Sequence, residues 1–189
     1  MTSQPRRCIS VARGTLAAAF LALLGTAGTP ARAAEPLVTE AIINAPVQEV
    51  WRLFTTGEGM QSWMVARADI DLKVGGLMRT RYSDDGALGD DKTIVNRILS
   101  FEPERMLSMQ VHTPPADFPF RDDVGDMWTV IYFQPLEPGM THVRVVGLGF
   151  RDDEASARMR EYFKRGNAWT LEQLQKKFWA KCASCAQSD

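Results

Sequence analysis

The feature that most constrains the fold is a long helix-forming segment that follows a series of short strands. Residues 152 to about 180 contain no proline, and their apolar side chains recur at helical spacing. The apolar positions are Met159, Tyr162, Phe163, Gly166, Trp169, Leu171, Leu174 and Phe178. A helix with so broad an apolar face must bury that face against another layer of secondary structure.

The chain before this helix predicts that layer as an antiparallel sheet. Alternating or β-branched runs separated by turn residues predict strands at 37–43, from 66 to the Gly75-Gly76 pair, and at 77–82, 93–101, 106–111, 128–134 and 141–148. After the first strand, apolar residues at helical spacing follow Pro46, and Gly57 and Gly59 break that helix before a short turn with Met60 and Trp63. We expect an α+β fold: a curved antiparallel sheet wrapped around the long C-terminal helix, with two short helices after the first strand.

The first 33 residues have the three-part pattern of a cleavable signal peptide. A basic start leads into an apolar run at 14–25, and Ala31 and Ala33 form an Ala-x-Ala cleavage site. This run is too short for the roughly 30 Å hydrocarbon core of a bilayer, so we expect no stable membrane span after cleavage. We therefore predict a single domain at 34–189 in the periplasm or outside the cell. The Arg6-Arg7 pair permits twin-arginine export, and general secretion remains equally open.

The chain without its first 33 residues is acidic. Those residues contain four arginines and no acid, so 18 basic and 23 acidic side chains remain. A surface of this sign repels phosphate backbones and anionic lipid. We expect no nucleic-acid partner, which leaves a small molecule or a protein.

The residues that commonly bind metals lack suitable spacing. Cys182 and Cys185 are close to the C-terminus, where a local disulfide or a pair of free thiols is favoured over redox catalysis. His112 and His142 have no partner at ligand spacing, and the aspartate pairs, such as those at 84–85 and 90–91, fall in turns where carboxylates face water. We expect neither a metal site nor a cofactor.

Several short segments, in a shared order and spacing, resemble one protein family. They are 43–51 (INAPVQEVW), 60–63 (MQSW), 69–76 (DIDLKVGG), 101–106 (FEPERM), Gly149-Phe150, and Gly166 followed by Leu171 and Leu174. Together they resemble the START-like, or SRPBCC, helix-grip superfamily, in the branch named for the C-terminal domain of the activator of the Hsp90 ATPase. Asn167 departs from that branch, which commonly has tryptophan there.

The resemblance implies a cavity between sheet and helix that takes an apolar or aromatic molecule. Strand alternation places Met78, Thr80 and Tyr82 on one face, and Trp128, Val130 and Tyr132 on another. If both faces point inward, the candidate ligand-binding residues are Trp63, Met78, Thr80, Tyr82, Trp128, Val130, Tyr132, Tyr162 and Trp169. The alternative is that these side chains fill the core and leave no cavity.

The connection at 113–126 is unusually long and contains three prolines together with Phe118 and Phe120. Long loops inside compact domains are often functional. We expect either a lid at the cavity mouth, with Phe118 and Phe120 as its apolar residues, or a plain mobile insertion.

These features favour a protein that binds a small hydrophobic or aromatic molecule without bond chemistry. The first alternative is an enzyme of cyclase or hydratase type that uses acid/base residues in the same cavity. Its candidate catalytic residues are Tyr82, Tyr132 and Arg81, although strand parity turns Arg81 away from Tyr82. The second alternative is a protein-interaction module that resembles the ATPase activator for which the family is named.

Overall fold

The computed structural model describes residues 34–137 and 139–185, with side chains described as far as residue 179. The signal peptide predicted at 1–33 and the side chains of Cys182 and Cys185 lie outside the described residues. All described residues belong to one compact unit, Arg32–Asp189. No helix among them is both long and apolar enough to cross a membrane.

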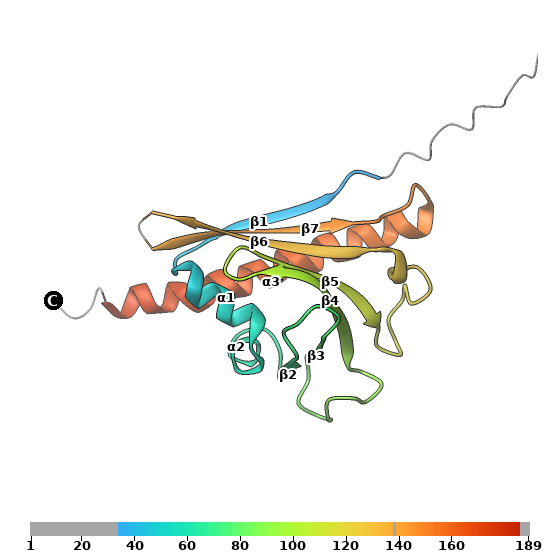
Figure 1. Ribbon diagram of the computed structural model, residues 1–189, viewed down its shortest axis with the longest axis horizontal. Helices are drawn as coiled ribbons and strands as arrows, with labels where there is room; N and C mark the ends of the chain where they lie inside the picture. Colours follow the sequence, from blue (N-terminus) through green and yellow to red (C-terminus); the bar gives the residue numbers. More distant parts are fainter. Residues whose placement is uncertain (1–33, 138, 186–189) are drawn as a thin grey trace, which may run out of the picture. The chain divides into compact units, whose positions relative to one another are not determined.

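The strands form one seven-stranded antiparallel sheet with the order β1-β7-β6-β5-β4-β3-β2 (Figure 1). They are β1 (Leu37–Ile43), β2 (Arg67–Ile70), β3 (Leu77–Arg81), β4 (Ile94–Glu102), β5 (Met106–Thr113), β6 (Trp128–Leu136) and β7 (Met140–Leu148). From β2 to β7 each strand pairs with its successor in the chain, and β1 completes the sheet beside β7. This arrangement confirms the predicted helix-grip fold.

The helices are α1 (Val47–Thr55), α2 (Gly57–Gln61), the single-turn 3-10 helix η1 (Val124–Asp126) and α3 (Glu154–Cys185). α1 and α2 are the two short helices predicted after the first strand. The two glycines that were predicted to break the helix, Gly57 and Gly59, instead lie within α2, because the Thr56 hydroxyl oxygen accepts a hydrogen bond from the Gly59 N–H at 2.9 Å and caps this helix. α3 runs lengthwise across one face of the sheet (Figure 1).

The strand β2 ends at Ile70, earlier than predicted. The Asp71 N–H still bonds to the Leu77 carbonyl, but the Lys73 N–H bonds to the Asp71 carbonyl and the Gly76 N–H to the Lys73 carbonyl. These local bonds form a compact turn between β2 and β3. Alternation in the sequence could not distinguish this turn from a continued strand, because Leu72 keeps the period of two.

The core consists of two apolar clusters, and α3 contributes to both. Leu171, Leu174 and Phe178, from its C-terminal half, pack with α1, α2 and the middle strands. Met159 and Phe163, from its N-terminal half, pack with Leu37, Val124, Met127 and Phe150. The helix is therefore held against the domain in two separate regions, with residues 164–170 between them.

The link between β7 and α3 is fixed by Gly149 and Arg151. Gly149 has a φ of 81°, and a Cβ at this position would lie 2.1 Å from the Asp126 carbonyl oxygen. The guanidinium of Arg151 binds Asp126 and Asp153, each at 2.8 Å, and also binds Asp123. These contacts join the end of the long 113–126 connection to the start of α3.

Candidate functional site

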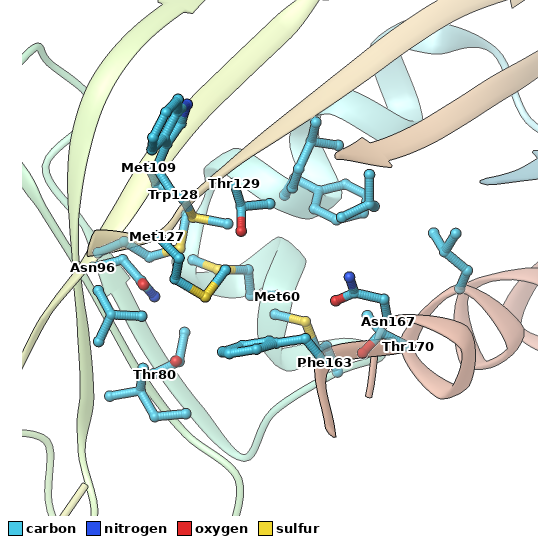
Figure 2. Close-up of a pocket in the computed structure, with 18 of the residues that line it drawn as sticks. Met60, Thr80, Asn96, Met109, Met127, Trp128, Thr129, Phe163, Asn167 and Thr170 are labelled. Carbon is cyan, nitrogen blue, oxygen red and sulfur yellow. The ribbon is translucent and has the colours of Figure 1, made fainter. Parts of the chain in front are cut away.

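A cavity of about 200 Å³ lies between the sheet and α3 (Figure 2). It lies beside the part of the helix between the two apolar clusters. The side chains of this region therefore do not fill the core completely. Its wall is formed by Phe54, Met60, Met64, Met78, Thr80, Tyr82, Ile94, Asn96, Met109, Val111, Met127, Trp128, Thr129, Ile131, Val145, Phe163, Asn167, Thr170 and Leu171.

Methionine dominates the apolar part of this wall. Five methionines line the cavity, from α2, the segment after it, β3, β5 and the residue between η1 and β6: Met60, Met64, Met78, Met109 and Met127. Methionine is unbranched and polarisable, so it adapts to irregular shapes and makes favourable contacts with aromatic rings. Such a lining suits an apolar or aromatic guest.

The polar groups of the wall are all uncharged. They are the hydroxyls of Thr80, Tyr82, Thr129 and Thr170 and the amides of Asn96 and Asn167. The Thr170 hydroxyl donates to the Gly166 carbonyl at 2.9 Å within α3. A mostly apolar wall with a few orienting polar groups is the usual composition of a small-molecule site.

The cavity adjoins a wider space of about 710 Å³, which we call the vestibule. Both spaces are bordered by Tyr82, Ile94, Val111, Phe163, Asn167 and Thr170, which form a throat between them. Beyond the throat the vestibule is lined by Tyr162 and Trp169 of α3 and by the segment around Phe118. Of the predicted ligand-binding residues, the structure thus places Met78, Thr80, Tyr82 and Trp128 at the inner cavity, and Tyr162 and Trp169 at the vestibule.

The 113–126 connection borders the vestibule through its proline- and phenylalanine-containing part. Phe118 lines the vestibule and contacts the ring of Tyr162 edge-on, with 5.6 Å between ring centroids. Phe120 lies behind, 5.8 Å from Phe118 and 5.7 Å from Tyr162. The segment predicted as a lid therefore stands at the mouth of the site, in contact with α3.

Tyr82 lies at the throat, and 53% of its surface is exposed. Desolvation by the surrounding protein, and then the nearby Tyr162, raise the pKa of its phenol above the usual value. The phenol therefore stays protonated at neutral pH, as a hydrogen-bond donor and acceptor beside the entrance.

Arg81 is only 3% exposed and is held by carboxylates. Its guanidinium binds Asp90 at 2.8 Å and Asp85 at 2.7 Å. A hydrogen bond from Arg81 lowers the pKa of Asp90, and the Ser83 hydroxyl followed by Arg81 lowers that of Asp85. These aspartates lie in the predicted turn, where they were expected to face water and cap local N–H groups. Asp90 does accept a hydrogen bond from the Lys92 N–H at 3.1 Å, and both aspartates also bind Arg81 and organise the loop after β3. Because its charge is already compensated, Arg81 is poorly suited to acid/base work.

Two predicted cavity residues of β6 lie on the wrong face of the sheet. Ile131 and Phe133 belong to the core cluster beneath α3, so alternation turns Val130 and Tyr132 to the opposite face. There the Tyr132 ring lies 5.9 Å from the guanidinium carbon of Arg144 on β7. Val130 and Tyr132 therefore do not line the cavity, and Tyr132 cannot act as a catalytic residue within it.

Two predicted tryptophans also differ from expectation. The Trp63 indole N–H donates to the Leu53 carbonyl at 3.2 Å, and its ring packs edge-on against Phe54 at 5.2 Å. Trp63 thus completes the core and does not line the cavity. Trp128 borders the cavity at the start of β6, but its indole points away from the other labelled side chains (Figure 2).

The inward-facing residues Asn96, Asn167 and Phe163 were not predicted as part of the site. Asn96 occupies an inward position between Ile94 and Ile98 on β4, a polar residue within an apolar alternation. Asn167 is four residues after Phe163 and four before Leu171, on the apolar face of α3. A search for polar residues that interrupt an apolar period would have found both.

The donor chemistry of the described residues offers no metal centre. Within them, no group of three or more His, Cys, Asp or Glu side chains could hold a metal ion. His112 lies beside Arg97, with 3.2 Å between the ring nitrogens and the guanidinium, and His142 faces Glu40 at 3.4 Å. Both histidines lie away from the cavity wall.

A curved antiparallel sheet that holds a long helix over an internal cavity defines a START-like helix-grip protein. The chain belongs to the family described as Activator of Hsp90 ATPase homolog 1-like protein, whose family model matches residues 44–179. No curated protein matches the sequence.

Solved structures share this fold at low sequence identity. A crystal structure of a Mesorhizobium loti protein is 24% identical and has a TM-score of 0.59, over 75% of this chain and 95% of that one. A solution structure of a Cytophaga hutchinsonii protein is 19% identical with a TM-score of 0.60, over 80% and 99%. The solution structure of the Aha1 dimer from Colwellia psychrerythraea is 14% identical with a TM-score of 0.56, over 77% and 96%. At these identities the similarity establishes the fold alone.

Proposed function

We propose that this protein binds a small hydrophobic or aromatic molecule in the cavity between the sheet and α3. One observation carries the proposal: the space between the two regions that hold α3 is left open, and methionines and aromatic rings line it. Burial of apolar ligand surface there gains about 25 cal/mol per Å², before the cost of association.

The vestibule supplies the route to this cavity. A ligand entering between Phe118 and Trp169 passes the throat at Tyr82 and Val111 and then contacts the methionines. The edge-on contacts of Phe118 and Phe120 with Tyr162 hold the 113–126 connection beside this route. We propose that this segment is the lid of the site.

The test is native mass spectrometry of the purified domain against a library of neutral hydrophobic and aromatic compounds. Hits are then titrated with the variant Val111→Phe, which places a ring in the throat. Val38→Phe is the matched control, because Val38 is exposed on β1, away from the cavity. Hits that are lost in Val111→Phe and kept in Val38→Phe support binding in the cavity. Absence of any hit, or equal binding by both variants, contradicts the proposal.

We also propose that the protein works outside the cytoplasm, on the basis of the signal-peptide pattern at 1–33. Cell fractionation and N-terminal sequencing of the natural product test this localisation. A mature chain that begins near residue 34 in the exported fraction supports it. A full-length cytoplasmic chain contradicts it.

The protonated Tyr82 at the throat supports a second candidate function, an enzyme that uses a general acid in the same cavity. Tyr82 is the single predicted catalytic residue that the cavity wall retains, since Tyr132 faces away and Arg81 is held by Asp85 and Asp90. If a compound found in the screen is converted, Tyr82→Phe should abolish turnover and weaken binding by no more than about fivefold, the effect of one net hydrogen bond. Unchanged turnover in that variant would exclude Tyr82 as the acid.

A further inference from the structure

Two side-chain amides face the inner cavity from opposite walls. Asn96 projects from β4 on the sheet side and Asn167 from α3 on the helix side, and both point into the space between (Figure 2). Among the described residues neither amide has a hydrogen-bond partner. Each amide offers two donors and an acceptor, so the cavity presents hydrogen-bonding capacity at both sides that the protein itself leaves unused.

The local structure argues that both amides serve the cavity. Asn96 interrupts the apolar series of Ile94 and Ile98, and Asn167 interrupts that of Phe163 and Leu171. Leucine at either place would complete an apolar face without leaving an unpaired amide, which is costly near an apolar interior. In addition, the register of β4 against β5 shifts between Val95 and Asn96. Such irregularities commonly re-aim a side chain next to a functional site.

Charge and size restrict what these amides can recognise. No charged side chain of the described residues lines the inner cavity, and an unpaired ion in an apolar site is strongly disfavoured. A cavity of about 150 Å³ holds benzene, so the volume of about 200 Å³ here suits one ring with small substituents.

We infer, on the basis of the proposed function, that the ligand is a neutral single-ring compound with hydrogen-bonding oxygen groups at opposite ends. Asn96 binds one of these groups and Asn167 binds the other. The methionines contact the faces of the ring, and the hydroxyls of Thr80 and Thr129 lie on the same wall as Asn96. The cavity thereby selects hydroxyl- or carbonyl-bearing rings over plain hydrocarbons and over carboxylates.

The first experiment titrates the wild-type domain with five rings of similar size at slightly acidic pH. 4′-Hydroxyacetophenone carries both oxygen groups, 4-ethylphenol and acetophenone carry one each, ethylbenzene carries none, and 4-hydroxybenzoate is an anion. We expect the first compound to bind most tightly and each lost group to weaken binding about fivefold, as expected for one net hydrogen bond. The anion should bind more weakly than every neutral compound that has a hydroxyl group.

The second experiment repeats the titration with Asn96→Leu and Asn167→Leu, which keep the branched shape of the side chain and remove its hydrogen-bonding atoms. Each variant should bind 4′-hydroxyacetophenone about tenfold more weakly and ethylbenzene at least as tightly as wild type. Thermal unfolding curves verify that the variants fold. If they do not fold, the wild-type titrations still test the inference.

The two levels of the proposal fail differently. Equal binding of ethylbenzene and 4′-hydroxyacetophenone, or tightest binding of the anion, overturns this inference and leaves binding in the cavity intact. If no neutral ring binds while larger hydrophobic compounds of the library do, the inferred ligand class is wrong and the proposed function stands. If nothing binds at all, both are overturned.

Discussion

Arg81, at the end of β3, and Asp90, in the loop that follows, form an ion pair with 2.8 Å between the guanidinium Nε and the carboxylate Oδ2. The guanidinium is almost entirely buried and also binds Asp85. A buried charge without its partner is strongly disfavoured. The loop that borders the vestibule is therefore held by electrostatics as well as by packing.

This pair predicts a loss of stability in acid. The pKa values of Asp85 and Asp90 are lower in the folded protein than in the unfolded chain, so their contribution is complete above about pH 4 and declines as the pH falls further. Asp90→Asn should be less stable than wild type at neutral pH and should lose less stability between about pH 4 and pH 2. Urea unfolding across this range measures the difference, and parallel curves for the two proteins would refute the linkage.

Leu174 predicts how strongly the C-terminal half of α3 is anchored. Its side chain is fully buried in the larger apolar cluster, so Leu174→Ala should reduce the free energy of unfolding by about 3 kcal/mol. Trp179→Ala on the same helix is the control, because that ring is mostly exposed, and it should cost less than about 1 kcal/mol. Chemical denaturation measures both, and similar losses in the two variants would contradict this description of α3.

The two tyrosines predicted for catalysis should now behave differently. Tyr82 borders the cavity, whereas Tyr132 lies on the other face of the sheet. For a ligand with a polar group at the throat, Tyr82→Phe should weaken binding about fivefold, which corresponds to one net hydrogen bond. Tyr132→Phe should leave affinity unchanged. Isothermal titration of both variants decides the matter, and an equal effect would count against the assigned orientation of β6.

Alanine substitutions at two glycines should change the free energy of unfolding in opposite directions. Gly149→Ala forces a Cβ against the Asp126 carbonyl at a φ of 81° and should cost more than about 2 kcal/mol. Gly166→Ala lies within α3, where a Cβ would meet no atom within 4 Å, and should stabilise the protein by about 0.5–1 kcal/mol through higher helix propensity. Thermal unfolding gives both signs, and a stable Gly149→Ala would show that the turn relaxes easily.

The fold was largely predictable because each strand and helix has its own spacing of apolar residues in the local sequence. The alternation in β3 and β7 and the helical spacing of α3 gave element bounds close to those observed. Where prediction failed, the cause was non-local. Alternation in β6 places Tyr132 and Phe133 on opposite faces of the sheet but does not determine which of the two faces the helix. Tyr132 was incorrectly predicted to face inward.

The candidate site was predicted only in part for a related reason. Met78, Thr80 and Tyr82 were identified because three successive inward positions of one strand share a face. The partners of Arg81 come from a loop whose path no period determines, so Asp85 and Asp90 appeared to be ordinary turn residues.

Residues 164–170 of α3 lie between the two regions that anchor the helix. This arrangement has an evolutionary consequence. Substitutions at Asn167 or Thr170 alter the cavity wall. They leave unchanged Leu174 and Met159, whose packing holds the helix against the domain. Evolution can therefore change which ligand the protein prefers with little loss in the free energy of unfolding. Proteins of the same architecture are then free to diverge in chemical preference while their scaffold stays constant.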